Sequence, residues 1–190
     1  MTESAFGCTA APAADCPNGD NEAIPEETAW YREFALSDFS GTPWDVTGAF
    51  QITTVHLGCW MSNANASVTI TVYGYTGTLY GATLDQSSLT QIGSVVATIG
   101  PAQVFTCTND VAVPITVPSI AAGSAFVVGV TSTDTVHDSG SPPCTITYAF
   151  RLGANGSGES RGSYVGDYCA TGTPIWTTDD ALIAVEGTTN

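Results

Sequence analysis

Hydrophobic and polar residues alternate along most of this chain, with the period of two that is typical of β-strands. Val68, Ile70 and Val72 stand two apart with threonines between them, and an aromatic-rich run begins at Trp30. Gly, Pro, Asn and Asp separate such runs, and we find no amphipathic helix longer than one or two turns. The runs that we assign to strands are residues 30–36, 46–60, 68–75, 92–99, 111–117, 125–130, 146–152, 164–165 and 181–185.

This succession of short strands predicts a fold class. About eight to ten strands separated by turn residues are typical of two packed antiparallel sheets. We therefore expect an all-β protein, a two-sheet β-sandwich that is jelly-roll-like, over residues 29–190.

Residues 1–28 depart from the alternating pattern. They are rich in Ala, Pro and acidic residues, and Cys8 and Cys16 flank a short Ala/Pro segment. The turn signal Pro17-Asn18-Gly19-Asp20 follows. We expect residues 1–28 to form a non-globular N-terminal arm closed by a local disulfide.

Charge narrows the range of partners. The chain carries three arginines, no lysine and 18 acidic residues, a net charge of −15, although only 11% of its residues are charged. A nucleic-acid partner needs Lys and Arg to release counterions, and anionic membrane surfaces recruit basic clusters. No apolar stretch approaches the roughly 20 residues of a membrane span, and no basic-then-apolar signal-peptide pattern is present in this sequence. We expect neither nucleic-acid binding nor membrane insertion.

The cysteines indicate an oxidising compartment. Their number is even, no C-x-x-C occurs, and the only histidines are His56 and His137, so the spacing of a zinc site is absent. We expect disulfides and an extracellular or cell-surface location. The order of the cysteines along the chain suggests the pairs Cys59–Cys107 and Cys144–Cys169 beside Cys8–Cys16, which is one of fifteen ways to pair six cysteines.

Several strand-forming runs of this sequence resemble runs of a module that is known from other proteins. The runs are residues 30–34, 68–77, 89–93, 121–130 and 152–155. Together they look like an uncharacterised β-sandwich module of secreted bacterial cell-surface proteins, over about residues 29–187. The resemblance implies a β-sandwich outside the cell, and that family has no assigned active site from which a catalytic residue could be transferred. Unlike its anchored members, this sequence has no sorting segment after Gly187.

Motifs of catalytic appearance lack the context that their chemistry needs. Gly158–Gly162 fits G-x-S-x-G, but no helix pattern and no histidine follow it. His137–Ser139 holds three triad residue types side by side, whereas a triad draws them from different elements. The acidic pairs 26–27 and 179–180 have no spacing that marks the two carboxylates of a glycosidase. We therefore predict no catalytic residue and no enzyme, with a glycoside hydrolase ranked last among the functions.

Two candidates for binding sites remain. Calcium is bound by several oxygen ligands, and acidic residues and an asparagine cluster in two segments. These residues are Asp15, Asn18, Asp20 and Glu22 in one segment and Asp134 and Asp138 in the other. Ordinary acidic loops are the alternative, so we expect either no cofactor or calcium.

Tryptophans supply the second candidate. Trp44 and Trp176 stand in Pro/Thr-rich segments that we interpret as loops, where exposed rings could stack on a sugar. Trp30 and Trp60 lie within strand patterns, where aromatic residues more often pack in a core.

These observations favour an assembly function over a chemical one. Our first hypothesis is a non-catalytic extracellular structural module, a subunit of an appendage, surface coat or virion. Disulfides and strand exchange through the N-terminal arm would hold its copies together, so its partner would be itself. The lack of lysine also removes a common protection of sheet edges against pairing. The alternative is a glycan-binding module, with calcium as a candidate cofactor.

Overall fold

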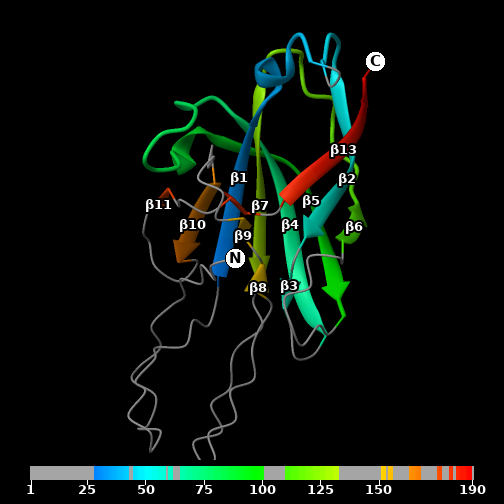
Figure 1. Cartoon of the computed structure of the whole chain (residues 1–190), viewed down its shortest axis with the longest axis vertical. Coiled ribbons are helices and arrows are strands. Elements are labelled where there is room, and N and C mark those ends of the chain that lie inside the picture. Colours follow the sequence, from blue (N-terminus) through cyan, green and yellow to red (C-terminus); the bar gives the residue numbers. More distant parts are fainter. Residues whose placement is uncertain are drawn as a thin grey trace, which may run out of the picture.

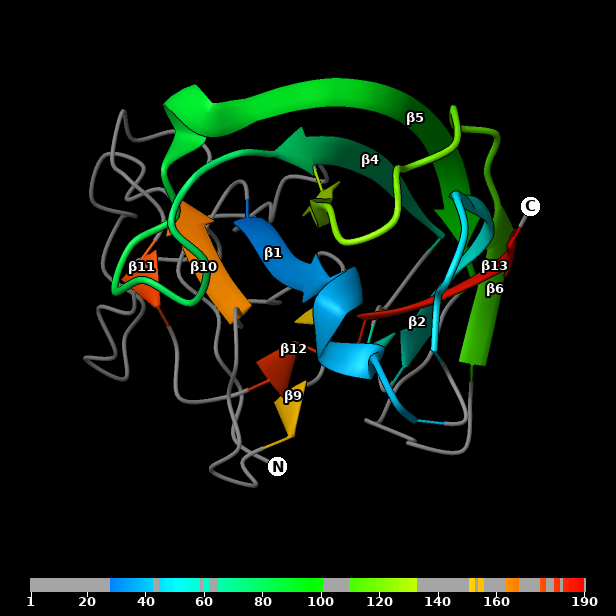
Figure 2. The ribbon, with the colours of Figure 1, turned by 90° about the horizontal axis from the view of Figure 1, so that it is seen from above.

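The computed structural model describes residues 28–42, 45–58, 60–61, 65–100, 110–132, 151–152, 154–155, 163–167, 175–176, 180–181 and 183–189. These residues form two antiparallel sheets that pack face to face, which confirms the predicted all-β sandwich (Figures 1 and 2). The only helices among them are two single 3-10 turns, η1 (Leu36–Phe39) and η2 (Gln86–Ser88). No helix in this part of the chain is long and apolar enough to span a membrane.

The larger sheet has six strands and the smaller has three. The larger has the order β11 (Ile175–Trp176), β10 (Ser163–Asp167), β1 (Thr28–Ala35), β7 (Ala125–Ser132), β4 (Ala66–Tyr75) and β5 (Leu89–Ile99). The smaller has the order β13 (Ile183–Thr189), β2 (Phe50–Gly58) and β6 (Asp110–Pro114). Two short pairs join β12 (Asp180–Ala181) to β9 (Ala154–Asn155) and β3 (Trp60–Met61) to β8 (Arg151–Leu152).

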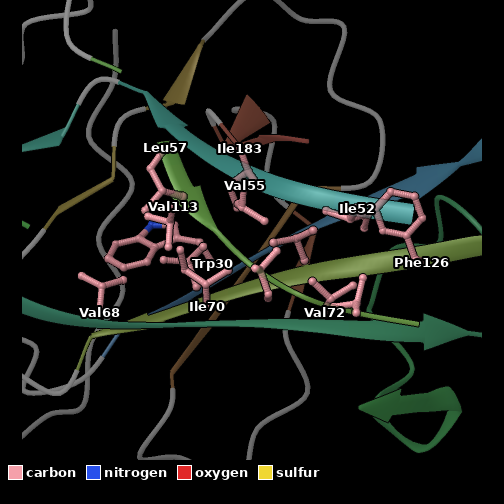
Figure 3. Close-up of a cluster of buried hydrophobic side chains, with 14 of the residues drawn as sticks. Trp30, Ile52, Val55, Leu57, Val68, Ile70, Val72, Val113, Phe126 and Ile183 are labelled. Atoms are coloured by element: carbon pink, nitrogen blue, oxygen red, sulfur yellow. The ribbon is translucent and has the colours of Figure 1, made fainter. Parts of the chain in front are cut away.

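The main hydrophobic core lies between the two sheets. Figure 3 shows Ile52, Val55 and Leu57 of β2 pointing toward the side chains of Val68 and Ile70 on β4, and all five are fully buried. Complete burial of an aliphatic side chain of this size stabilises a fold by about 1.5–3 kcal/mol. The alternating residues read from the sequence are therefore the ones that hold the sheets together.

Aromatic rings pack together in the core around Phe126, near the start of β7. The ring of Phe126 is stacked on that of Phe34, with ring centroids 4.9 Å apart, and is tilted against that of Phe50 at 6.5 Å. Trp30 is only 2% exposed, so its predicted place in the core is confirmed.

Several strand boundaries differ from the sequence-based prediction. β2 begins at Phe50 rather than at residue 46. β6 ends at Pro114 rather than at residue 117, and a proline is tolerated there because β6 is the edge strand of the smaller sheet. Ile115 and Val117 are nevertheless buried, and the Ile115 N–H donates to the Thr53 carbonyl oxygen at 3.0 Å. β1 begins at Thr28, one residue before the predicted domain boundary.

β7 is the strand that brings distant segments of the larger sheet together. It pairs with β1 on one side and with β4 on the other, both antiparallel, although it lies far from each along the chain. In this register Glu33 of β1 and Tyr73 of β4 both stand opposite Val127. The same face of β1, β7 and β4 thus carries side chains from three separate parts of the sequence.

Candidate functional site

Most of the site residues suggested by the sequence lie outside the described residues. They are Cys8, Cys16, Cys59, Cys107, Cys144, Cys169, Trp44, Asp15, Asn18, Asp20, Glu22, Asp134 and Asp138. The disulfides and the calcium sites therefore stay predictions, and within the described part of the chain no three His, Cys, Asp or Glu side chains gather as metal ligands.

Trp176 is the exception, and its predicted loop is wrong. Its backbone lies in β11, where it stands opposite Tyr164 of β10. The pairing adds a short edge strand to the larger sheet within a segment that is rich in Pro and Thr. Glycan binding by Trp44 and Trp176 stays a prediction.

The outer face of the larger sheet carries a cluster that the sequence did not reveal. Along β1, Trp30 and Phe34 face the main core, whereas Tyr31 and Glu33 point to the opposite side, and Tyr31 joins a second hydrophobic cluster there. We call this second region the tyrosine face. Its members are Tyr31, Glu33, Tyr73, Tyr75 and Tyr164, which come from β1, β4 and β10.

The loop between β4 and β5, residues 76–88, covers the tyrosine face. Leu84 of this loop is fully buried against it, and Leu79 packs beside it. Two tyrosine hydroxyls tie the loop down, since Tyr75 donates to the Thr78 carbonyl oxygen at 3.1 Å and Tyr164 donates to that of Gly81 at 3.2 Å. Figure 2 shows the loop turning back beside β10.

The end of this loop is closed by a local turn around Asp85. One carboxylate oxygen of Asp85 accepts from the Ser87 N–H at 3.0 Å and from the Ser87 hydroxyl at 2.6 Å. The other accepts from the Ser88 hydroxyl at 2.6 Å. These bonds favour the charged form, with Ser87 contributing most, and they lower the pKa of Asp85. The turn shapes η2 and leads directly into β5.

Glu33 lies beneath the loop and is only 3% exposed. Its Oε2 accepts a hydrogen bond from the Tyr80 N–H at 2.8 Å, and its Oε1 has no hydrogen-bond partner. The hydroxyl hydrogens of Tyr75 and Tyr164 are already given to loop carbonyl oxygens, so they are not free for Oε1. A proton on Oε1 would remove the need for a donor to this oxygen, because the neutral carboxylic acid can itself donate a hydrogen bond.

The surroundings of Glu33 also favour its neutral form. Burial raises the pKa of Glu33, and the hydrogen bond from the Tyr80 N–H offsets only part of the rise. The pKa values of Tyr75 and Tyr164 are raised as well, by burial first and by the charge of Glu33 second. The arrangement is that of a polar anchor for a loop, in which the neutral forms of all three groups are favoured.

Tyr80 is held in an uncommon backbone conformation by this anchor. Its φ is +58°, and it is the one non-glycine residue in the described ranges with a positive φ. Its N–H donates to Glu33, and its hydroxyl donates to a carboxylate oxygen of Asp38. The left-handed turn at Tyr80 is therefore fixed from both the backbone and the side chain.

The second feature is the free edge of β5. β5 is eleven residues long and ends the larger sheet, and no described strand lies on its far side. It contains no charged residue and no proline. A bulge opposite Val72 and Tyr73 interrupts its pairing with β4, and beyond the bulge the pairing runs regularly from Gly93 to Ile99. We call residues Gly93–Ile99 the β5 edge.

The other described sheet edges are blunted in ways that β5 is not. β11 has two residues, and β6 has five and ends in Pro114. β13 has seven, but it carries Glu186, and its pairing with β2 is interrupted by a bulge opposite Glu186 and Gly187. Short length, charge, proline and bulges are the usual protections of an edge against pairing with another chain. The β5 edge has none of them over seven consecutive residues.

Val96 stands at the middle of the β5 edge. Its side chain is 65% exposed, and it is the one large hydrophobic residue of the described chain with that degree of exposure. On the opposite side of the same strand, Val95 and Ala97 pack partly against the main core, and Ile99 is buried. The strand thus presents, beside an apolar side chain, backbone groups that pair with no other strand in the described part of the chain.

The sequence held only part of the information needed to predict the tyrosine face and the β5 edge. The lack of charge in residues 89–99 is plain in the sequence, whereas the position of this strand at an edge is not. The alternation around Glu33 is equally plain, but nothing local shows that a loop more than forty residues later covers it.

Comparison with known proteins adds no relative to this description: no family model, no curated protein and no solved structure matches the chain.

Proposed function

We propose that this chain is a non-catalytic structural module that assembles by accepting a strand of another chain along the β5 edge. The observation that carries the proposal is the long, uncharged and proline-free edge with Val96 exposed at its centre. Strand addition uses main-chain hydrogen bonds for affinity and alternate side chains for fit, and an open edge of this kind is its template.

The setting is an extracellular or cell-surface structure. Its support is the composition: six cysteines and a surface poor in charged residues, with 18 acidic residues but only three basic ones. Such a module serves as a subunit of an appendage, coat or virion, and its function is to hold neighbours rather than to transform a substrate. The tyrosine face supports this assignment, because the hydrogen bonds of Glu33, Tyr75 and Tyr164 fasten loop 76–88 to the sheet.

The test is the molar mass of the native protein in solution, measured by light scattering over a range of concentrations. The wild-type chain is expected to exceed the 19.5 kDa of a single copy as concentration rises. Val96→Lys places a charge on the edge and is expected to shift the protein to the monomer. Repeating the measurement with reductant separates strand pairing from covalent links between cysteines.

Thr90→Lys is the matched control. Thr90 lies on β5 as well and is exposed, but it precedes the bulge and stands outside the β5 edge. It adds the same charge to the same strand, and its assembly is expected to match that of the wild type. Assembly of Val96→Lys at wild-type strength would exclude the β5 edge as the joining surface.

A further inference from the structure

We infer that the strand accepted by the β5 edge is the β5 edge of a second copy, paired antiparallel about a twofold axis at Val96. This inference rests on the proposed function and names the partner. The regular run from Gly93 to Ile99 has Val96 as its central residue, with three residues on either side. An antiparallel pair of identical strands is isologous, so it needs a segment that fits its own reverse.

The side chains of the β5 edge fit this pairing position by position. Val96 would face Val96 of the second copy, which covers the most exposed apolar side chain. Ser94, whose hydroxyl already donates to the Ile70 carbonyl oxygen at 3.2 Å, would face Thr98 on the outer face, and the Thr98 hydroxyl could donate to it. Such cross-strand aliphatic and hydroxyl pairs each add a few tenths of a kcal/mol to about 1 kcal/mol.

On the inner face, Val95 would lie opposite Ala97, and both already pack against the main core. Gly93 would lie opposite Ile99. Val117 packs against Gly93 from inside the sandwich, so the space beneath this end of the edge is already filled. The twofold axis keeps equivalent faces on the same side, and the two larger sheets would join into one continuous sheet.

Charge favours self-pairing at this strand over pairing elsewhere. Each copy carries a net charge of −15, so two copies repel one another over most of their surfaces. The β5 edge is uncharged, and so is the rest of the eleven-residue strand β5. Two copies can therefore approach along it without bringing acidic side chains of these strands together.

The N-terminal arm of a neighbouring copy is the competing occupant. Residues 1–28 hold six acidic residues and three prolines, and no run within them is as rich in β-branched residues as Ser94–Ile99. The prolines at positions 12, 17 and 25 also limit the length of any strand that the arm can supply. The β5 edge is the better partner for itself.

The test is a charge exchange at position 96, read as molar mass by light scattering. In the symmetric pair, residue 96 of one copy faces residue 96 of the other, so Val96→Lys alone and Val96→Glu alone place like charges together. Each variant is expected to be monomeric. An equimolar mixture is expected to form a one-to-one heterodimer, because the charges facing each other are then opposite. Thr90→Lys mixed with Thr90→Glu is the control and is expected to behave as the wild type.

The outcomes separate the inference from the proposed function. If both single variants are monomeric and the mixture stays monomeric, the β5 edge joins chains but its partner is not β5, and self-pairing is overturned. Loss of assembly on deletion of residues 1–28, with Val96 intact, would then identify the arm as the donor. If the single variants assemble like the wild type, or the wild type is monomeric throughout, the proposed function and the inference both fail.

Discussion

At the scale of single residues, Glu33 is the side chain whose place needs most explanation. It lies on a strand face that is buried by a loop, with one carboxyl oxygen bonded to the Tyr80 N–H and the other without a partner. A buried charge without sufficient donors is costly, so the neutral acid is favoured. Stability should therefore depend on pH through this residue.

Glu33→Gln should raise the free energy of unfolding at pH 7 by on the order of 1 kcal/mol. The neutral amide keeps an oxygen to accept the Tyr80 N–H and gains a donor where Glu33 has an unpartnered oxygen. The pKa of Glu33 is raised in the folded state above its ordinary value of 4.5. The stability that Glu33 contributes to the wild-type fold is thus complete at pH values below 4.5 and is lost as the pH rises through the pKa of Glu33 in the folded state.

Urea titrations of wild type and variant at several pH values provide the measurement. The difference in unfolding free energy should be small near pH 4 and should grow toward pH 7. Glu186→Gln is the control: it removes the same charge from a side chain that is 69% exposed and lies 3.3 Å from His56 Nε2, so it is expected to leave stability unchanged or slightly lower and not to raise it toward pH 7. A Glu33→Gln difference that is constant with pH would contradict a raised pKa in the folded state.

At the scale of the elements, the edges of the sheets differ more than their interiors. The register of β13 against β2 shifts between Glu186 and Gly187, where Thr53 is an extra residue on β2. Bulges increase the local twist and disrupt the regular ladder, which discourages pairing. A comparable bulge in β5 lies near one end and leaves seven regular residues free. The difference in bulge position is one reason why β5 is the open edge.

Gly187→Ala should destabilise the protein by about 1–3 kcal/mol, since a methyl group there has no space. A Cβ on Gly187 would collide with the carbonyl oxygen of Gln51 and would lie 2.7 Å from Cζ of the Phe50 ring. The backbone of β2 cannot move aside without losing its pairing. Thermal or urea unfolding monitored by circular dichroism provides the measurement.

Gly100→Ala is the control for the loss of glycine itself. A Cβ on Gly100 has no neighbour within 4 Å, so its effect is expected to stay within about 0.5 kcal/mol. Equal stability of the two alanine variants would show that the contact between β13 and β2 is looser than the structure has it.

At the scale of the whole molecule, charge and fold act against each other in assembly. A net charge of −15 keeps copies apart, whereas the β5 edge offers one uncharged line of approach. Salt shortens the range of repulsion, from a Debye length of about 10 Å at 0.1 M to about 3 Å at 1 M. It has little direct effect on hydrogen bonds between uncharged strands.

Self-association should therefore strengthen as the salt concentration rises. Light scattering of the wild-type chain in 0.05 M and 0.5 M sodium chloride, at pH 7, provides the measurement. The heterodimer of Val96→Lys with Val96→Glu should gain less, because salt also screens the attraction at position 96. Weaker association of the wild type at high salt would indicate an interface held by ion pairs instead.

The sequence by itself determined the strands and the character of their surfaces. The alternation at Val68, Ile70 and Val72 is a local property of the chain, and burial of one side of a strand follows directly from it. The same holds for Trp30, and for the lack of lysine that leaves the edges without that protection. These features can be predicted from a residue and its near neighbours in the sequence.

The tertiary structure decided which strand lies at the edge of its sheet and that loop 76–88 covers the outer face of the larger sheet. β5 is an edge because β7 pairs with the other side of β4, and Glu33 is buried because residues 76–88 fold across β1. The pairing that placed Trp176 in β11 is equally distant in sequence. Each depends on contacts between segments that are far apart along the chain, and local alternation carries no information about which of them meet.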